Sequence, residues 1–220
     1  MNRQTNISDN TKRLTGIAAF SALAFGASLL TNIPVGFLTF DAKDAVITIA
    51  SFIYGPISAV FMSFITTLLE FVSIGNTGIY GALMDFVSTL SFTLTASIIY
   101  EYKRDLKGAL IALGSASTFY TIVMMAANLI ITPLYMGVSA SAVKAMIPTM
   151  LLPFNVAKAF MNSALVMFLY KPTSRLVRRI GFAKPSDSNS TPARRDALIF
   201  LSIAGAFFAT AIVIFVLLRK

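Results

Sequence analysis

Four stretches of this sequence are long, apolar and free of charged side chains: residues 14–40, 45–69, 108–143 and 197–218. A helix needs about 20 such residues to cross the hydrocarbon core of a bilayer. Only 12% of the 220 residues are charged, roughly half the share found in soluble domains, and the mean hydropathy is +0.78. We therefore expect an all-α polytopic membrane protein.

Seven helices are predicted from the apolar segments. Gly55-Pro56 interrupts the second run, and because proline disfavours helix at the residue before it, a short helix and a turn are preferred there. One tilted span over 45–69 is the alternative. The predicted helices cover 14–32, 45–54, 57–72, 79–100, 108–131, 147–170 and 197–218, with loops at 33–44, 73–79, 101–107 and 133–146.

The basic residues indicate the orientation. With seven spans and a cytoplasmic N-terminus, thirteen of the 18 Lys and Arg residues fall in cytoplasmic segments, as the positive-inside rule requires. Outside are Lys43, Lys144, Arg219 and Lys220, and the C-terminus is extracellular. The net charge of +9 is thus explained without a nucleic-acid partner. The expected parts are a cytoplasmic N-terminal segment (1–13), a membrane domain (14–172), a basic cytoplasmic linker (173–196) and a last transmembrane helix (197–220).

Several kinds of chemistry are excluded by composition. The chain has no Cys and no His, so it lacks the usual zinc, haem and iron–sulfur ligand sets and any Ser-His or Cys-His nucleophilic pair. It also lacks a GxxxxGK[ST] phosphate loop. We expect neither an enzyme nor a prosthetic group, and any uphill work requires energy from a partner.

A polar stripe interrupts the sixth predicted helix. Asn155, Lys158 and Asn162 are spaced by three and four residues, so they lie on one face. Lys158 is about 16 Å into the helix at 1.5 Å per residue, and ionisable groups at such depth usually mark a ligand or ion path. Snorkelling to an interface, pairing with Asp85, and binding a ligand are all open to Lys158; the two neighbouring carboxamides favour the ligand.

Other polar residues sit inside predicted helices. Asp85 is about 9 Å into its helix, whereas Glu70 is about one turn from the outer end and is expected to be interfacial. Asn128 is at a depth suited to the same pocket, although a lone Asn more often bonds between helices. Ala18, Ala22 and Gly26 form a small-residue ridge on the first helix, suited to internal packing or to docking a partner protein.

Four motifs together resemble the riboflavin-specific substrate-binding (S) components of energy-coupling-factor (ECF) vitamin transporters. They occur in the family's order and spacing, between residues 14 and 172. The motifs are Leu38-Thr-Phe-Asp41-Ala-Lys-Asp44 with Phe52-Ile-Tyr-Gly55-Pro56; Gly78-Ile-Tyr-Gly81-Ala-Leu-Met-Asp85-Phe; Asn128-Leu-Ile-Ile-Thr-Pro133-Leu-Tyr135; and Pro153-Phe-Asn155-Val-Ala-Lys158.

The resemblance implies a six-helix protein of a bacterial cell membrane that captures riboflavin from outside. Residues at the positions of Asn128, Asn155 and Lys158 hydrogen-bond the flavin ring in the family. Asp41, Tyr80 and Asp85 are further candidates for ligand contacts or ion pairs.

The family also implies partners: a transmembrane coupling protein, docked through small residues such as Ala18, Ala22 and Gly26, and two cytoplasmic ATPase subunits. Asp85 and Ile79 depart from the family pattern, which has an amide and a proline there, and the last helix is additional. A different vitamin, a phosphorylated flavin, or ion-coupled transport through Asp85 and Lys158 remain alternative functions.

Overall fold

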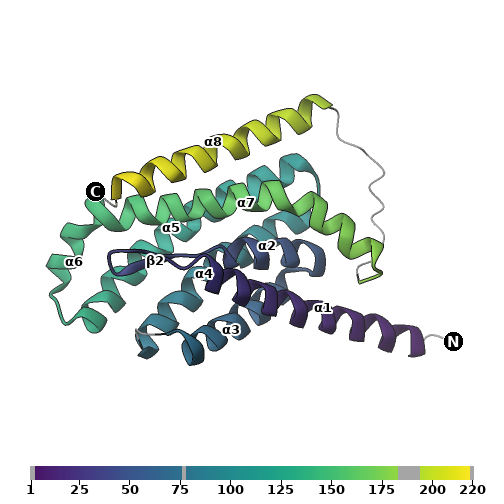
Figure 1. The fold of residues 1–220 in the computed structure, drawn as a ribbon, viewed down its shortest axis with the longest axis horizontal. Coiled ribbons are helices and arrows are strands. Elements are labelled where there is room, and N and C mark those ends of the chain that lie inside the picture. Colours follow the sequence, from purple (N-terminus) through teal and green to yellow (C-terminus); the bar gives the residue numbers. More distant parts are fainter. Residues whose placement is uncertain (1–2, 76–77, 183–193, 219–220) are drawn as a thin grey trace.

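The computed structural model describes residues 3–75, 78–182 and 194–218. They form a helical bundle with one small hairpin (Figure 1). The elements are α1 (Arg3–Leu30), β1 (Ile33–Val35), β2 (Leu38–Phe40), α2 (Lys43–Tyr54), α3 (Pro56–Ser73), α4 (Gly78–Tyr102), α5 (Leu106–Met136), α6 (Ala140–Met146), η1 (Ile147–Leu151), α7 (Leu152–Arg179) and α8 (Arg194–Leu218).

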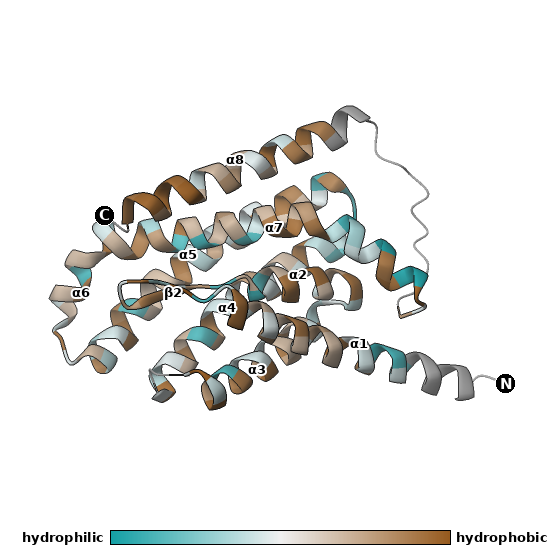
Figure 2. Cartoon of the chain, in the orientation of Figure 1, coloured by the Kyte–Doolittle hydropathy of each residue, from teal (hydrophilic) through white to brown (hydrophobic). Residues whose placement is uncertain are grey.

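The prediction of an all-α polytopic membrane protein is confirmed. Among the described residues, six helical segments are long and apolar enough to cross a membrane: Asn10–Leu30, Pro56–Ser73, Gly78–Tyr102, Leu106–Met136, Ala140–Arg179 and Leu198–Leu218. Figure 2 shows hydrophobic residues along these helices, with α8 apolar over most of its length. The predicted extra C-terminal helix is present as α8.

Helix α2 is the central element. It has only 12 residues, of which ten are buried, and it contacts α1, α3, α4 and α7. Its short length follows from the predicted break, because Gly55 adopts φ 93° and Pro56 begins α3. The guanidinium of Arg13 donates to the Tyr54 carbonyl oxygen at 2.8 Å and so satisfies one of the last carbonyls of α2.

The helix boundaries differ from the prediction in the second half of the chain. Helix α5 does not stop at Thr132 but continues through Pro133 to Met136, and the predicted loop at 133–146 is largely helical, with α6 in it. Proline is tolerated inside membrane helices, because neighbouring groups satisfy the carbonyl that it leaves free. Helix α5 ends where Gly137 takes the left-handed conformation with φ 65°.

Two more boundaries differ. Helix α7 passes Pro172 and ends at Arg179, nine residues beyond the predicted end at 170. The predicted loop at 33–44 contains the β1–β2 hairpin, with Ile33 opposite Phe40 and Val35 opposite Leu38. The centre of the predicted linker, 185–192, and the basic pair Arg219-Lys220 lie outside the described residues.

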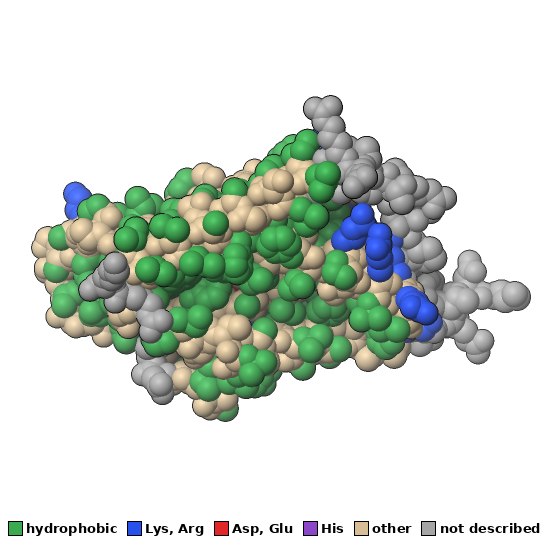
Figure 3. Space-filling model, turned by 45° about the horizontal axis from the view of Figure 1, so that its top comes forward, with side chains coloured by type: hydrophobic (Ala, Val, Ile, Leu, Met, Phe, Trp, Pro, Cys, Tyr) green, Lys and Arg blue, Asp and Glu red, His purple; other side chains and the backbone are tan. Residues whose placement is uncertain are grey.

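Basic side chains are concentrated at one end of the molecule. Figure 3 shows Lys and Arg gathered where α1 begins and α7 ends, with a single basic side chain at the opposite end of this face. Arg178 and Arg179 occupy the last turn of α7, where cations interact favourably with the helix dipole.

Candidate ligand-binding site

A cavity of about 400 Å³ lies inside the bundle, between the hairpin and helices α3, α4, α5 and α7. This volume is in the usual range for small-molecule pockets. The cavity brings together all six residues that the sequence proposed as ligand contacts or ion pairs. They are Asn128, Asn155, Lys158, Asp41, Tyr80 and Asp85.

Asn128 and Asn155 are held in fixed orientations. Asn128 donates from Nδ2 to the Met124 carbonyl at 2.7 Å and accepts from the Thr132 hydroxyl at 3.0 Å. Asn155 donates from Nδ2 to the carbonyl of Leu151 at 2.7 Å, and its Oδ1 accepts from the Tyr120 hydroxyl at 2.8 Å. A carboxamide has two N–H donors and two acceptor positions, so each keeps capacity for a ligand.

Lys158 forms an ion pair with a residue far away in sequence. Its Nζ lies 2.9 Å from Asp41 Oδ2 and 3.9 Å from Asp44 Oδ2. Snorkelling and pairing with Asp85 are therefore wrong. Burial raises the pKa of Asp41, but the ammonium groups of Lys158 and Lys43 outweigh it and hold the pKa below its ordinary value. An ammonium has three N–H donors, so Lys158 can bind Asp41 and a ligand together.

A second buried lysine was missed by sequence reasoning, which placed Lys43 outside the membrane. Lys43 is fully buried at the start of α2, with its Nζ 2.6 Å from Glu70 Oε2 and 2.5 Å from Asp85 Oδ1. Thr67 donates to the other Asp85 oxygen at 2.8 Å. Glu70 lines the cavity in addition to pairing with Lys43. One sequence feature could have predicted that Lys43 is buried. Glu70 and Asp85 are two acids in apolar helices that contain too few cations to pair with them.

Asn162 belongs to the protein core rather than to the cavity. Its Oδ1 accepts from the Ala45 backbone N–H at 3.2 Å, and its Nδ2 donates to Asp44 Oδ2 at 3.5 Å. These bonds join α7 to the first turn of α2. The stripe predicted on the sixth helix therefore divides: Asn155 and Lys158 face the cavity, and Asn162 supports α2.

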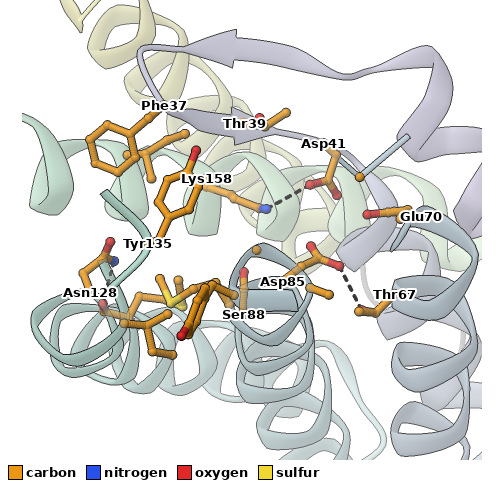
Figure 4. A pocket seen from close by; sticks show the side chains of 18 of the residues that line it. Phe37, Thr39, Asp41, Thr67, Glu70, Asp85, Ser88, Asn128, Tyr135 and Lys158 are labelled. Atoms are coloured by element: carbon orange, nitrogen blue, oxygen red, sulfur yellow. Dashed lines mark hydrogen bonds and ion pairs between the residues drawn. The ribbon is translucent and has the colours of Figure 1, made fainter. Parts of the chain in front are cut away.

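The polar groups are distributed unevenly along the cavity. In Figure 4, Asn128, Phe37 and Tyr135 lie toward one end, Asp41, Glu70 and Asp85 lie toward the other, and Lys158 lies between them. Apolar and aromatic side chains complete the walls; they include Phe37, Leu38, Met84, Tyr120, Met124 and Phe154. The site suits a ligand that is apolar over part of its surface and has hydrogen-bond donors at the end near the carboxylates.

The small-residue ridge of α1 faces away from the bundle. Ala18 and Ala22 are exposed, and the space around Gly26 is open to 4 Å. The buried side of α1 is formed instead by Ile17, Phe20 and Ala24. The internal-packing alternative therefore fails, and the ridge is a free surface of this chain.

Together these features define a membrane-embedded helical bundle with an internal cavity of a size and lining suited to a small molecule. The family model described as "ECF transporter, substrate-specific component" matches residues 12–170. Because this match spans most of the chain, the protein belongs to that family, whose members are the substrate-specific components of transporters.

Individual relatives agree with the family assignment. The chain is 31% identical over 189 residues to the riboflavin transporter RibU of Staphylococcus aureus (strain TCH60), covering 81% of this chain and 98% of the relative. It is 26% identical over 172 residues to the riboflavin transporter FmnP of Bacillus subtilis (strain 168), covering 72% and 90%. A solved S component of a bacterial ECF transporter superposes with a TM-score of 0.66 at 28% identity, covering 77% of this chain and 99% of that one.

Removing the missed lysine is expected to destabilise the fold. In Lys43→Met, the partly buried Glu70 and Asp85 lose their cation; breaking a fully buried pair typically costs about 3–5 kcal/mol, which sets the upper limit here. We expect a clear fall in the thermal unfolding midpoint of the detergent-solubilised protein. Lys144→Met, at an exposed lysine, is the matched control and should leave the midpoint unchanged. An unchanged midpoint in Lys43→Met would contradict the ion-pair assignment.

Proposed function

We propose that this chain is the riboflavin-capturing subunit of an ECF-type importer. The observation that carries the proposal is the meeting of Asn128, Asn155 and Lys158 in one buried cavity with aromatic walls. The relatives named riboflavin transporters support the choice of vitamin.

The cavity chemistry fits the two parts of riboflavin. The pyrimidine edge of the isoalloxazine ring has carbonyl acceptors and one N–H, which match an ammonium donor and amphoteric carboxamides. The ribityl tail has hydroxyl donors, and the carboxylates of Asp41, Glu70 and Asp85 are acceptors at the opposite end of the cavity. In this arrangement the ring lies near Asn128 and the tail lies near Asp85.

Delivery to the cytoplasm requires the energy-coupling partners of the family: in our proposal, a transmembrane coupling protein and two cytoplasmic ATPase subunits. The chain has no phosphate loop of its own. We assign docking to the exposed ridge of Ala18, Ala22 and Gly26, whose small side chains permit close helix contact. The binding domain is residues 14–172 in a bacterial cell membrane.

The orientation proposed is a cytoplasmic N-terminus (1–13), a cytoplasmic linker (173–196) and an extracellular C-terminus after the last helix (197–220). The basic residues at the α1-start and α7-end side of the molecule support this choice (Figure 3).

The phosphorylated-flavin alternative is disfavoured by charge. The cavity lining includes three carboxylates and one ammonium, while the second ammonium, Lys43, lies behind the wall. A phosphate on the tail would add about −1.5 to −2 charges beside Glu70 and Asp85. In a titration that follows the quenching of flavin fluorescence on binding, the dissociation constant of riboflavin should be at least about tenfold lower than that of its 5′-phosphate. This corresponds to a difference of about 1.4 kcal/mol in binding free energy. Equal affinity would contradict the proposed tail position, and no quenching by either flavin would overturn the proposed function.

Lys158 is expected to contribute directly to flavin affinity. Lys158→Ala removes a charged donor and should weaken riboflavin binding by about 1.5–3 kcal/mol, or roughly 10- to 150-fold. The exposed Lys144→Ala is the matched control. Circular dichroism checks that the variant is folded. Wild-type affinity in a folded Lys158→Ala protein would remove this residue from the site.

The energy source separates this proposal from ion-coupled transport. Asp85 pairs with Lys43 rather than with Lys158, so the direct charge pair which that mechanism invokes is absent from the described site. In cells that contain the partner subunits, riboflavin uptake should stop when ATP is depleted and should continue when an uncoupler removes the proton gradient while ATP is maintained. The opposite pattern would favour ion coupling.

A further inference from the structure

Helix α8 lies outside the part of the chain that the family model matches, which ends at residue 170. It is nevertheless a specifically packed element that lies along α7 (Figure 1). Phe200, Ala204 and Ala211 are buried, whereas Val213 and Leu217 on the other side are exposed. A helix with one buried apolar stripe has a defined packing face, so α8 is more than a loose anchor.

Near its C-terminal end, α8 contacts the wall of the ligand cavity. The ring of Phe215 lies edge-on to Phe40 of β2, with centroids 5.1 Å apart, and edge-on to Phe154 of α7, with centroids 5.9 Å apart. Phe40 is followed directly by Asp41, and Phe154 by Asn155. Both of these polar residues line the cavity, so Phe215 packs directly behind two elements of the site.

The β1–β2 hairpin separates α8 from the cavity. Val35 and Phe40 are buried in an apolar cluster with Phe154 and Ala211, which includes the partly buried Phe215. The paired residues Pro34 and Thr39, and Phe37 at the turn, line the cavity. The hairpin therefore has one face toward the ligand and one face toward α8.

Such a short hairpin depends on what it packs against. It has three pairs of facing residues, and an isolated two-stranded hairpin is at best marginally stable. We propose that α8 is a buttress for the hairpin, with Phe215 as a positioning residue that holds Phe40, and through it Asp41, against the cavity. In this proposal the ligand leaves past this wall, so the buttress slows dissociation. The ligand part rests on the proposed riboflavin function; the hairpin part does not.

The first test measures riboflavin release by stopped-flow fluorescence, with Phe215→Ala in the full-length chain. Loss of two edge-to-face ring contacts should raise the dissociation rate about tenfold. The matched control is Phe208→Ala on the same helix. The ring of Phe208 contacts Phe168 instead, with centroids 6.4 Å apart, so this variant should release riboflavin at the wild-type rate. An unchanged rate in Phe215→Ala, or an equal increase in both variants, would overturn the proposal.

The second test uses the ligand-free protein and so stands even if riboflavin is not the ligand. Amide hydrogen exchange over residues 33–40 should be faster in Phe215→Ala than in wild type, while exchange over α4 stays the same. Phe208→Ala should leave both unchanged. Protection of 33–40 at the wild-type level in Phe215→Ala would overturn the buttress itself.

If Phe215→Ala does not fold, the milder variants Phe40→Leu and Phe215→Leu can be compared singly and together in the same release experiment. If the two rings act on each other, the double variant should change the release rate less than the product of the two single changes. Strictly multiplicative effects would contradict the positioning role.

Discussion

Two lysines buried between carboxylates determine how this bundle is assembled. Lys158 of α7 binds Asp41 before α2, and Lys43 at the start of α2 binds Glu70 of α3 and Asp85 of α4. An unpaired charge in such surroundings is strongly destabilising, whereas a paired one is tolerated. The pairs therefore fix the first turn of α2 relative to three other helices, and the cavity forms where these charges meet.

The sequence alone predicted the membrane architecture and part of this arrangement of polar and charged residues. Uncharged runs predicted the membrane helices, Gly55-Pro56 predicted the break between α2 and α3, and helical spacing placed Asn155 and Lys158 on one face. These features are local, and local spacing is what a sequence displays. Asn128 was also predicted in the pocket, from its depth and from the family resemblance.

The features that were not predicted depend on contacts between residues far apart in the sequence. Asp41 and Lys158 are 117 positions apart, and no periodicity relates them. Lys43 resembled a surface residue because it lies in the predicted loop at 33–44, and only the return of the chain into the bundle buries it. The hairpin has three residues per strand, too few for alternation to be recognised. Helix α5 continued through Pro133 because a bundle can satisfy a free carbonyl that an isolated helix could not.

Helix α2 is too short to cross the hydrocarbon core of a bilayer by itself. Twelve residues span about 18 Å, against about 30 Å of hydrocarbon, and the C-terminal end of α2 is fixed beside Arg13. Helix α2 is therefore about 12 Å shorter than the hydrocarbon is thick, and the chain enters its N-terminal end through the β1–β2 hairpin. Lipid provides no hydrogen-bond partner for a backbone group. Opening the hairpin where lipid reaches it would therefore cost more than opening it in water.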